Sequence, residues 1–147
     1  MVPSSLFHPF RSLARRVRRS APVTHPEAEA PLALPRRIDG PAAATQLTRD
    51  LLRNRREDIT LAIYLDDWHR LVGTAILAVG WVQATRLSVR PILQGAQACR
   101  VTSCIVVRYR RWGALSATEP EDRSFRTLAA ASARHGLTIL DHLVVTA

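Results

Sequence analysis

The sequence contains no lysine, although it is strongly basic. All 21 basic side chains are arginine, they face 12 acidic side chains, and the net charge is +9. GC-rich codon usage, which favours arginine, alanine, proline and valine together, is the simpler explanation; selection for the bidentate geometry of arginine is the alternative. In either case the charge predicts a non-specific attraction to polyanions and to anionic membrane surfaces.

Cysteines and long apolar runs are scarce as well. Cys99 and Cys104 are five positions apart and fit neither a C-x-x-C motif nor a ligand pair with histidine. We interpret them as small buried side chains in a reducing compartment. The longest apolar run, residues 74–82, is under half of the roughly 18–20 residues that a membrane span needs. The start of the sequence lacks a signal-peptide pattern, so we expect a cytoplasmic protein without a transmembrane segment.

Several common catalytic patterns are also missing from the sequence. There is no glycine-rich loop for phosphates and no zinc-finger spacing. Ser103 and Ser116 have no identifiable base partner, so a Ser-His-Asp arrangement is not supported. Asp66 and Asp67 are adjacent in a polar turn, where neighbouring carboxylates face apart and do not form an acid–base dyad.

Residues 1–38 are predicted to form a disordered basic tail rich in proline and arginine. The segment contains six prolines and no pattern from which a core element could be built. Leu6, Phe10, Leu13 and Val17 recur at helical spacing, with arginines on the remaining faces. A basic amphipathic helix over residues 6–19 that contacts anionic membrane or nucleic acid is therefore the alternative to a plain solubilising tail.

Residues 39–147 are predicted to form one α/β domain with a mixed sheet flanked by helices. Hydrophobic periodicity changes between the helical and the strand pattern along this part of the chain, in the order helix, strand, strand, helix, strand, helix, strand. Strands that alternate with helices favour a sheet covered by helices. The predicted helices cover residues 42–58, 90–98 and 119–136, and the predicted strands cover residues 59–65, 71–81, 103–107 and 137–145.

Four pieces of this region resemble the RadC-like members of the JAB/MPN superfamily. They are the strand and turn over residues 63–71, the hairpin around Gly73, the helix start at residues 89–93, and the run from residue 134 to 145 that contains Leu-Asp-His-Leu-Val-Val. The resemblance covers residues 57–146. It implies a JAB/MPN-like fold, which belongs to the cytidine-deaminase-like class of mixed sheets.

The same resemblance implies a degenerate metal-binding motif. Family members with an intact JAMM motif hold zinc through a His-x-His pair and through an Asp that follows Ser-x-x, and an upstream Glu is the general base. In this sequence the two histidines align with Arg108 and Arg110. The Ser, the Asp and the base align with Thr118, Glu121 and Asp58.

Arginine cannot replace a histidine ligand. Two neutral imidazoles and a carboxylate leave an open position for a water whose pKa falls toward ~7. A guanidinium group has no lone pair to donate and stays protonated. We therefore expect no catalytic residue, no bound metal and no cofactor. Arg108 or Arg110 should instead fill the former metal site and pair with Asp58 and Glu121, because stranded carboxylates are costly; the alternative is that both arginines point into solvent.

These features predict a catalytically inactive binding or scaffold module with an unidentified protein partner. One alternative is a zinc-dependent JAMM-type hydrolase with a rearranged site. Its imidazole ligands would come from His69 or His142, and Asp58 and Glu121 would supply carboxylates. The spacing of the domain histidines fits no ligand pattern, however, and favours capping or core roles.

A second alternative is a basic nucleic-acid-binding module linked to DNA repair. The candidate residues are Arg108, Arg110, Arg111 and Trp112. Arginines can contact phosphates while an aromatic ring stacks on a base. The competing interpretation is that Tyr109 and Trp112 pack against the edge of the sheet while the arginines are solvated.

Overall fold

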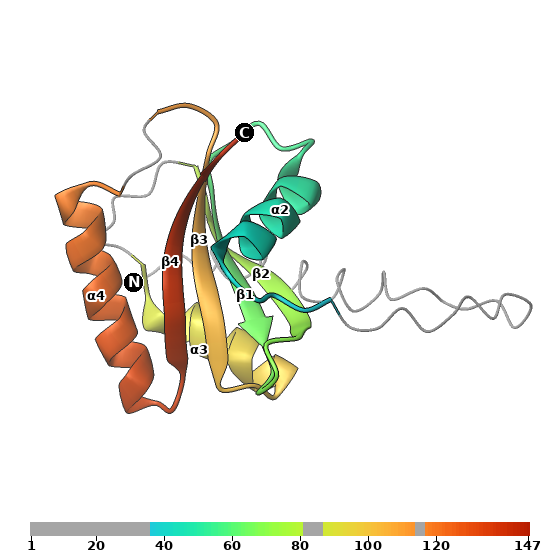
Figure 1. The fold of residues 1–147 in the computed structure, drawn as a ribbon. Coiled ribbons are helices and arrows are strands. Elements are labelled where there is room, and N and C mark those ends of the chain that lie inside the picture. The colour runs from blue at the N-terminus through green and yellow to red at the C-terminus, as the bar shows by residue number, and fades with distance from the viewer. Residues whose placement is uncertain (1–35, 81–86, 114–116) are drawn as a thin grey trace, which may run out of the picture.

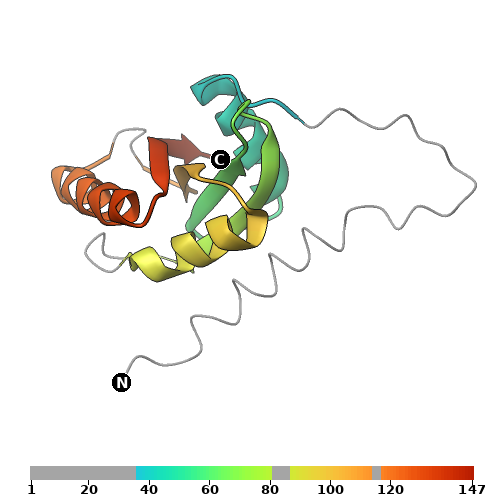
Figure 2. The same cartoon turned by 90° about the horizontal axis from the view of Figure 1, so that it is seen from below.

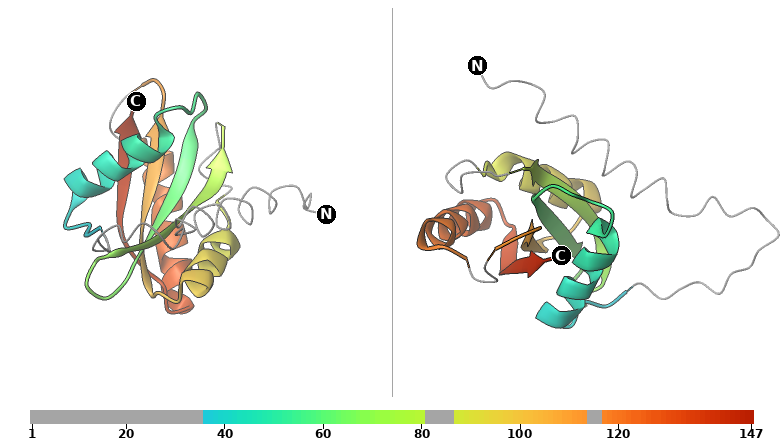
Figure 3. Two further views of the ribbon diagram at one scale, coloured as in Figure 1. Left: turned by 90° about the vertical axis from the view of Figure 1, so that its right-hand side faces the viewer. Right: turned by 90° about the horizontal axis from the view of Figure 1, so that it is seen from above.

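A computed structural model describes residues 36–80, 87–113 and 117–147. It contains one four-stranded sheet with the strand order β2-β1-β3-β4. Helix α2 covers one face of the sheet, and α3 and α4 cover the other (Figures 1, 2 and 3). The elements are α2 (Pro41–Leu52), β1 (Ile59–Leu65), β2 (Leu71–Val79), α3 (Val89–Cys99), β3 (Ser103–Arg110), α4 (Glu119–Arg134) and β4 (Thr138–Thr146).

The sheet is mixed, as the alternation of strands and helices predicts. Strand β1 pairs antiparallel with both β2 and β3. Strand β3 pairs parallel with β4, and α4 is the crossover between them. A parallel connection needs such a crossover element, whereas β1 and β2 are joined by a short turn. The predicted α/β architecture is confirmed.

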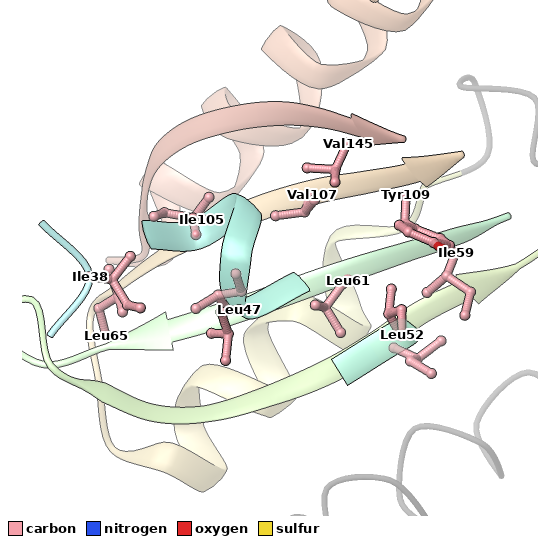
Figure 4. Packing of buried hydrophobic residues seen from close by; sticks show 13 residues of the cluster. Ile38, Leu47, Leu52, Ile59, Leu61, Leu65, Ile105, Val107, Tyr109 and Val145 are labelled. Atoms are coloured by element: carbon pink, nitrogen blue, oxygen red, sulfur yellow. The ribbon is translucent and has the colours of Figure 1, made fainter. Parts of the chain in front are cut away.

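The core has two layers because the central strand is buried on both faces. All seven residues of β1 are buried, and successive side chains of a strand point to opposite faces. Leu61 and Ile63 pack toward α2, a layer that Figure 4 shows with Leu47 and Leu52 of that helix. Ala62 packs toward α3 and α4.

Several boundaries differ from the prediction, including the ends of α2, β2 and β3. Helix α2 ends at Leu52, although the predicted helix continues to residue 58. Strand β2 ends at Val79, two residues earlier than predicted. Strand β3 continues to Arg110, three residues further than predicted, because it pairs along its length with both β1 and β4. The arginines aligned with the zinc ligands therefore belong to a strand and not to a loop.

The predicted tail falls almost entirely outside the described residues, and so does the candidate amphipathic helix. The described chain begins at residue 36 and pairs at once with the turn between β1 and β2. Arg36 accepts a backbone hydrogen bond from Leu71, and Ile38 donates one to His69. Ile38 is buried in the layer under α2. No helix among the described residues is long and apolar enough to cross a membrane.

A glycine lets α3 pack closely on the sheet. The Tyr64 hydroxyl donates a hydrogen bond of 2.9 Å to the carbonyl oxygen of Ile92. Burial raises the pKa of Tyr64 far above its ordinary value, so the phenol keeps its proton and remains a donor. The ring lies directly under Gly95, and a Cβ atom at that position would overlap the hydroxyl and the ring.

Replacement of Gly95 by alanine is therefore expected to destabilise the domain. Alanine in a helix is favoured by about 1 kcal/mol over glycine, but overpacking against a buried ring costs about 1–3 kcal/mol. Urea denaturation of Gly95→Ala should show a net loss of stability. Gly40→Ala is the matched control, since a Cβ at Gly40 would meet nothing within 4 Å. A Gly95→Ala variant as stable as wild type would contradict the close contact.

Candidate functional site

Arg108 and Arg110, near the end of strand β3, point toward the layer of α3 and α4. Cys104 and Val106 belong to the core layer under these helices, and Tyr109 belongs to the layer under α2. Because side chains alternate along a strand, Arg108 and Arg110 share the face of Cys104 and Val106. Both guanidinium groups thus project toward the beginning of α4.

Both arginines form ion pairs with Glu121. The Nε atom of Arg108 lies 3.0 Å from Oε1 of Glu121. The Nη2 atom of Arg110 donates to both carboxylate oxygens. The Arg108 side chain is 6% exposed, and those of Arg110 and Glu121 are each 12% exposed. The ion pairs hypothesised for Glu121 are thus present, and neither arginine points into solvent.

A capping box fixes the position of Glu121 at the start of α4. The backbone N–H of Thr118 donates to Oε2 of Glu121 at 2.7 Å, and Thr118 Oγ1 accepts from the backbone N–H of Glu121 at 3.4 Å. This reciprocal arrangement satisfies two donors at the helix start. The spacing of Thr118 and Glu121 is the usual sequence signature of such a cap. Helix capping is therefore a second reason, besides the alignment with the JAMM motif, for a hydroxyl and a carboxylate at these positions.

The Glu121 carboxylate is strongly held in its ionised form. Burial raises its pKa, but the hydrogen bonds from Arg110 and Thr118 and the charge of Arg110 outweigh burial and lower the pKa to about 2. Two guanidinium groups surround this one carboxylate. The positions that align with zinc ligands therefore carry a local excess of one positive charge and no histidine, which does not fit a zinc ion.

Asp58, aligned with the general base, has a different partner. It immediately precedes β1, and its Oδ1 atom accepts a hydrogen bond of 3.1 Å from the backbone N–H of Arg111. Its own carbonyl oxygen accepts a hydrogen bond of 2.7 Å from Gly80. Asp58 thus ties the beginning of β1 to the ends of β2 and β3, which is a structural role.

The histidines of the alternative zinc site lie apart. His69 belongs to the turn that follows β1, with a positive φ of 58°, whereas Asp58 precedes the same strand. His142 lies on β4, opposite Val106 of β3. Among the described residues, no group of three or more histidine, cysteine, aspartate or glutamate side chains could hold a metal ion.

His142 instead belongs to a stacked pair over an open hollow. Its ring stacks on Phe125 of α4, with the centroids 4.3 Å apart and the planes inclined by 13°. Its backbone N–H donates to the carboxylate of Asp141 at 2.8 Å. Burial lowers the pKa of His142, which favours the neutral ring. The hollow, of about 630 Å³, is lined by residues of α4 and β4 that include Asp122, Phe125 and His142.

The four residues predicted to contact nucleic acid separate into two groups. Arg108 and Arg110 are held by Glu121. Arg111 and Trp112 lie beyond the end of β3 and are exposed. The Trp112 side chain does not pack on the sheet edge: it is 79% exposed, and the guanidinium carbon of Arg111 lies 5.6 Å from its ring centroid.

A mixed sheet with α2 on one face and α3 and α4 on the other, with the third strand meeting a capped helix at Glu121, defines an α/β domain of the JAB/MPN class. Comparison with known families agrees with this assignment: the model of the RadC-like JAB domain matches residues 38–147. The chain belongs to the RadC-like JAB domain family. The predicted resemblance is confirmed.

Relatives in several bacteria match the same region. The chain is 32% identical over 112 residues to a UPF0758 protein of Burkholderia mallei (strain SAVP1), a match that covers 75% of this chain and 40% of the relative. It is 31% identical to a UPF0758 protein of Burkholderia thailandensis, over 75% of this chain and 42% of the relative. A UPF0758 protein of Photobacterium profundum is 22% identical, with 74% and 48% covered. The chain thus spans less than half the length of these relatives.

Replacement of Glu121 by glutamine should strongly destabilise the domain. The amide keeps the length of the side chain but removes the carboxylate with which two nearly buried guanidinium groups form ion pairs. Removal of one partner of a buried ion pair typically costs about 3–5 kcal/mol, and urea denaturation of Glu121→Gln should show a loss of this order. Glu119→Gln is the control, because its pair with Arg123 is exposed and such pairs contribute about 1 kcal/mol or less.

The stabilisation by Glu121 should also depend on pH. Its pKa falls from an ordinary value of 4.5 to about 2 on folding. A lowered carboxyl pKa stabilises the folded state above the unfolded pKa, and this contribution is lost as the pH falls toward the folded pKa. The difference in unfolding free energy between wild type and Glu121→Gln should therefore be constant above about pH 5 and shrink toward pH 2. A difference that stays constant down to pH 2 would contradict the ion pairs.

Proposed function

We propose that this domain is a non-catalytic binding or scaffold module built on the RadC-like JAB fold. One observation carries the proposal: the positions aligned with the zinc ligands are joined to one another by the ion pairs of Arg108 and Arg110 with Glu121. In the active members that the sequence resembles, the corresponding side chains converge on a metal. Here they converge on each other.

The chemistry of this arrangement opposes metal-dependent hydrolysis. A catalytic zinc site needs lone-pair donors and one open position for water. Guanidinium groups have no lone pair with which to bind a metal, and their positive charge repels a dication. Asp58, in the place of the general base, uses a carboxylate oxygen to hold the backbone of Arg111. This oxygen is therefore already engaged and is not free to accept a proton from an attacking water.

The same residues have a coherent structural role. Glu121 belongs to the first turn of α4, whereas both arginines belong to the end of β3. Their ion pairs join the two ends of the connection between these elements. We infer that the ion pairs replace a metal as the link between strand and helix, so that the fold persists without its usual chemistry.

The partner of such a module is a macromolecule, because a scaffold acts through its surface. The relatives are more than twice as long as the matched region, so the proposal concerns this domain and not a whole protein of that length. We also propose a cytoplasmic location for the module, because its two cysteines fit a reducing compartment.

Metal analysis of the purified protein tests the proposal. Wild-type protein is incubated with excess zinc and then desalted, and its zinc content is measured by elemental mass spectrometry. It should retain far less than one zinc per chain. A combined Arg108→His, Arg110→His and Glu121→Asp variant restores the ligand types and should retain about one zinc per chain. It should also gain thermal stability when zinc is added, because a ligand that binds only the folded state stabilises it.

Arg111→His is the matched control, since it adds an imidazole one position outside the ligand pattern and should bind no zinc. Stoichiometric zinc in the wild-type protein would overturn the proposal. A restored variant that is folded by circular dichroism but does not bind zinc would show that Arg108 and Arg110 do not occupy ligand positions.

A further inference from the structure

A group of exposed arginines and one tryptophan gathers at the end of the sheet where β1 begins and β3 ends. We call it the sheet-end cluster. Its members are Arg53, Arg55, Arg56, Arg111 and Trp112. The first three follow α2, and the last two follow β3, so the cluster joins segments that are more than 50 residues apart in sequence.

Strand pairing brings these two segments together. Ile59 of β1 is paired with Tyr109 of β3, and Leu52 of α2 packs in the same part of the core (Figure 4). The Asp58 carboxylate binds the backbone N–H of Arg111. Arg56 precedes Asp58 by two residues, so its Cα atom lies within about 8 Å of that of Asp58. Arg56 thus lies close to the residues after β3, and Arg53 and Arg55 belong to the same connection between α2 and β1.

The guanidinium groups of the cluster are not neutralised within the described part of the chain. All four arginines are exposed, and none forms a salt bridge with a described residue. The two neighbouring carboxylates, Glu57 and Asp58, accept hydrogen bonds from the backbone N–H groups of Arg56 and Arg111. Four positive charges face two negative ones, so the surface retains a local positive excess.

The opposite end of the sheet provides an internal comparison. Trp68 is 67% exposed there, and the guanidinium carbon of Arg70 lies 4.7 Å from its ring centroid. Arg70, however, is paired with Asp66, and Arg37 is paired with Asp39. Both ends expose a tryptophan beside an arginine, but Arg70, the arginine beside Trp68, already has an acidic partner, whereas Arg111 forms no salt bridge with a described residue. This difference selects the sheet-end cluster as the anion-binding surface.

The chemistry of the cluster fits a strand of nucleic acid whose bases are unstacked. Arginine contacts phosphate oxygens with bidentate hydrogen bonds, and an exposed aromatic ring stacks on a base for about 1–3 kcal/mol. A duplex offers phosphates but keeps its bases inside the stack, and an acidic peptide offers carboxylates but no base to stack. Of these three ligands, only single-stranded nucleic acid would contact both the arginines and the ring of Trp112.

We propose that the sheet-end cluster binds single-stranded nucleic acid, with Arg53, Arg55, Arg56 and Arg111 on the phosphates and Trp112 stacked on a base. The surface differs from the one that the sequence alone predicts, because Arg108 and Arg110 are held by Glu121 and the arginines after α2 replace them. The inference does not depend on the absence of zinc, since no member of the cluster occupies a position aligned with a ligand.

Fluorescence anisotropy with a labelled oligothymidylate of about 12 nucleotides tests this proposal on the full chain. Trp112→Ala should weaken binding about tenfold, which corresponds to about 1.4 kcal/mol and to one stacked base. The combined Arg53→Gln, Arg55→Gln and Arg56→Gln variant should weaken binding and flatten its dependence on salt. Three lost phosphate contacts on a single strand reduce the logarithmic salt slope by about 2.

Trp68→Ala is the matched control for the tryptophan, and it should bind as wild type does. A second control replaces Arg15, Arg16, Arg18 and Arg19 of the N-terminal segment by glutamine, which separates its contribution from that of the cluster. Circular dichroism and thermal unfolding verify that each variant is folded.

Three outcomes would overturn the proposal. The first is binding that Trp112→Ala and the triple arginine variant leave unchanged while the N-terminal replacements abolish it. The second is equal affinity for a duplex of the same length, which would indicate that the cluster contacts phosphates but stacks on no base. The third is equally effective competition by polyglutamate, which would indicate general attraction of acidic polymers. The zinc content of Trp112→Ala should equal that of wild type, so this test and the metal test fail independently.

Discussion

The structure depends on the contact of one carboxylate with two guanidinium groups. Arg108 is almost fully buried at the end of the central part of the sheet, and a charge in that position is tolerable only with a close counter-charge. Glu121 supplies it from the first turn of α4, where a capping box already orients its side chain. The same contact therefore offsets the desolvation of the arginines and anchors α4 to β3.

The strand period explains why arginines that are close in sequence have different surroundings. Arg108 and Arg110 lie on one face of β3 and meet Glu121, whereas Arg111 and Trp112 follow the end of the strand and face solvent. One residue of difference separates a buried ion pair from an exposed cation. The basic stretch is thus two surfaces with different chemistry, although its composition is uniform.

Much of the fold was predictable from local pattern, and much of the site was not. The apolar run from Ile59 to Leu65, the acidic start of α4 and the Gly136 stop each identify an element without tertiary information. The extension of β3 to Arg110 depends on pairing with two neighbours, which no local signal reports. The contact of Asp58 with Arg111 joins residues 53 positions apart, and the partnership of the arginines after α2 with Trp112 follows from that same pairing. The capping spacing of Thr118 and Glu121, by contrast, is legible in the sequence.

Strand β4 is at one margin of the sheet, and its exposed backbone could serve as a template for another chain. In its middle, the N–H of His142 is already bonded to the carboxylate of Asp141. An incoming strand would find this donor occupied and would have to approach a negative charge. A short acidic side chain thus disfavours the pairing of another strand at this point of the margin.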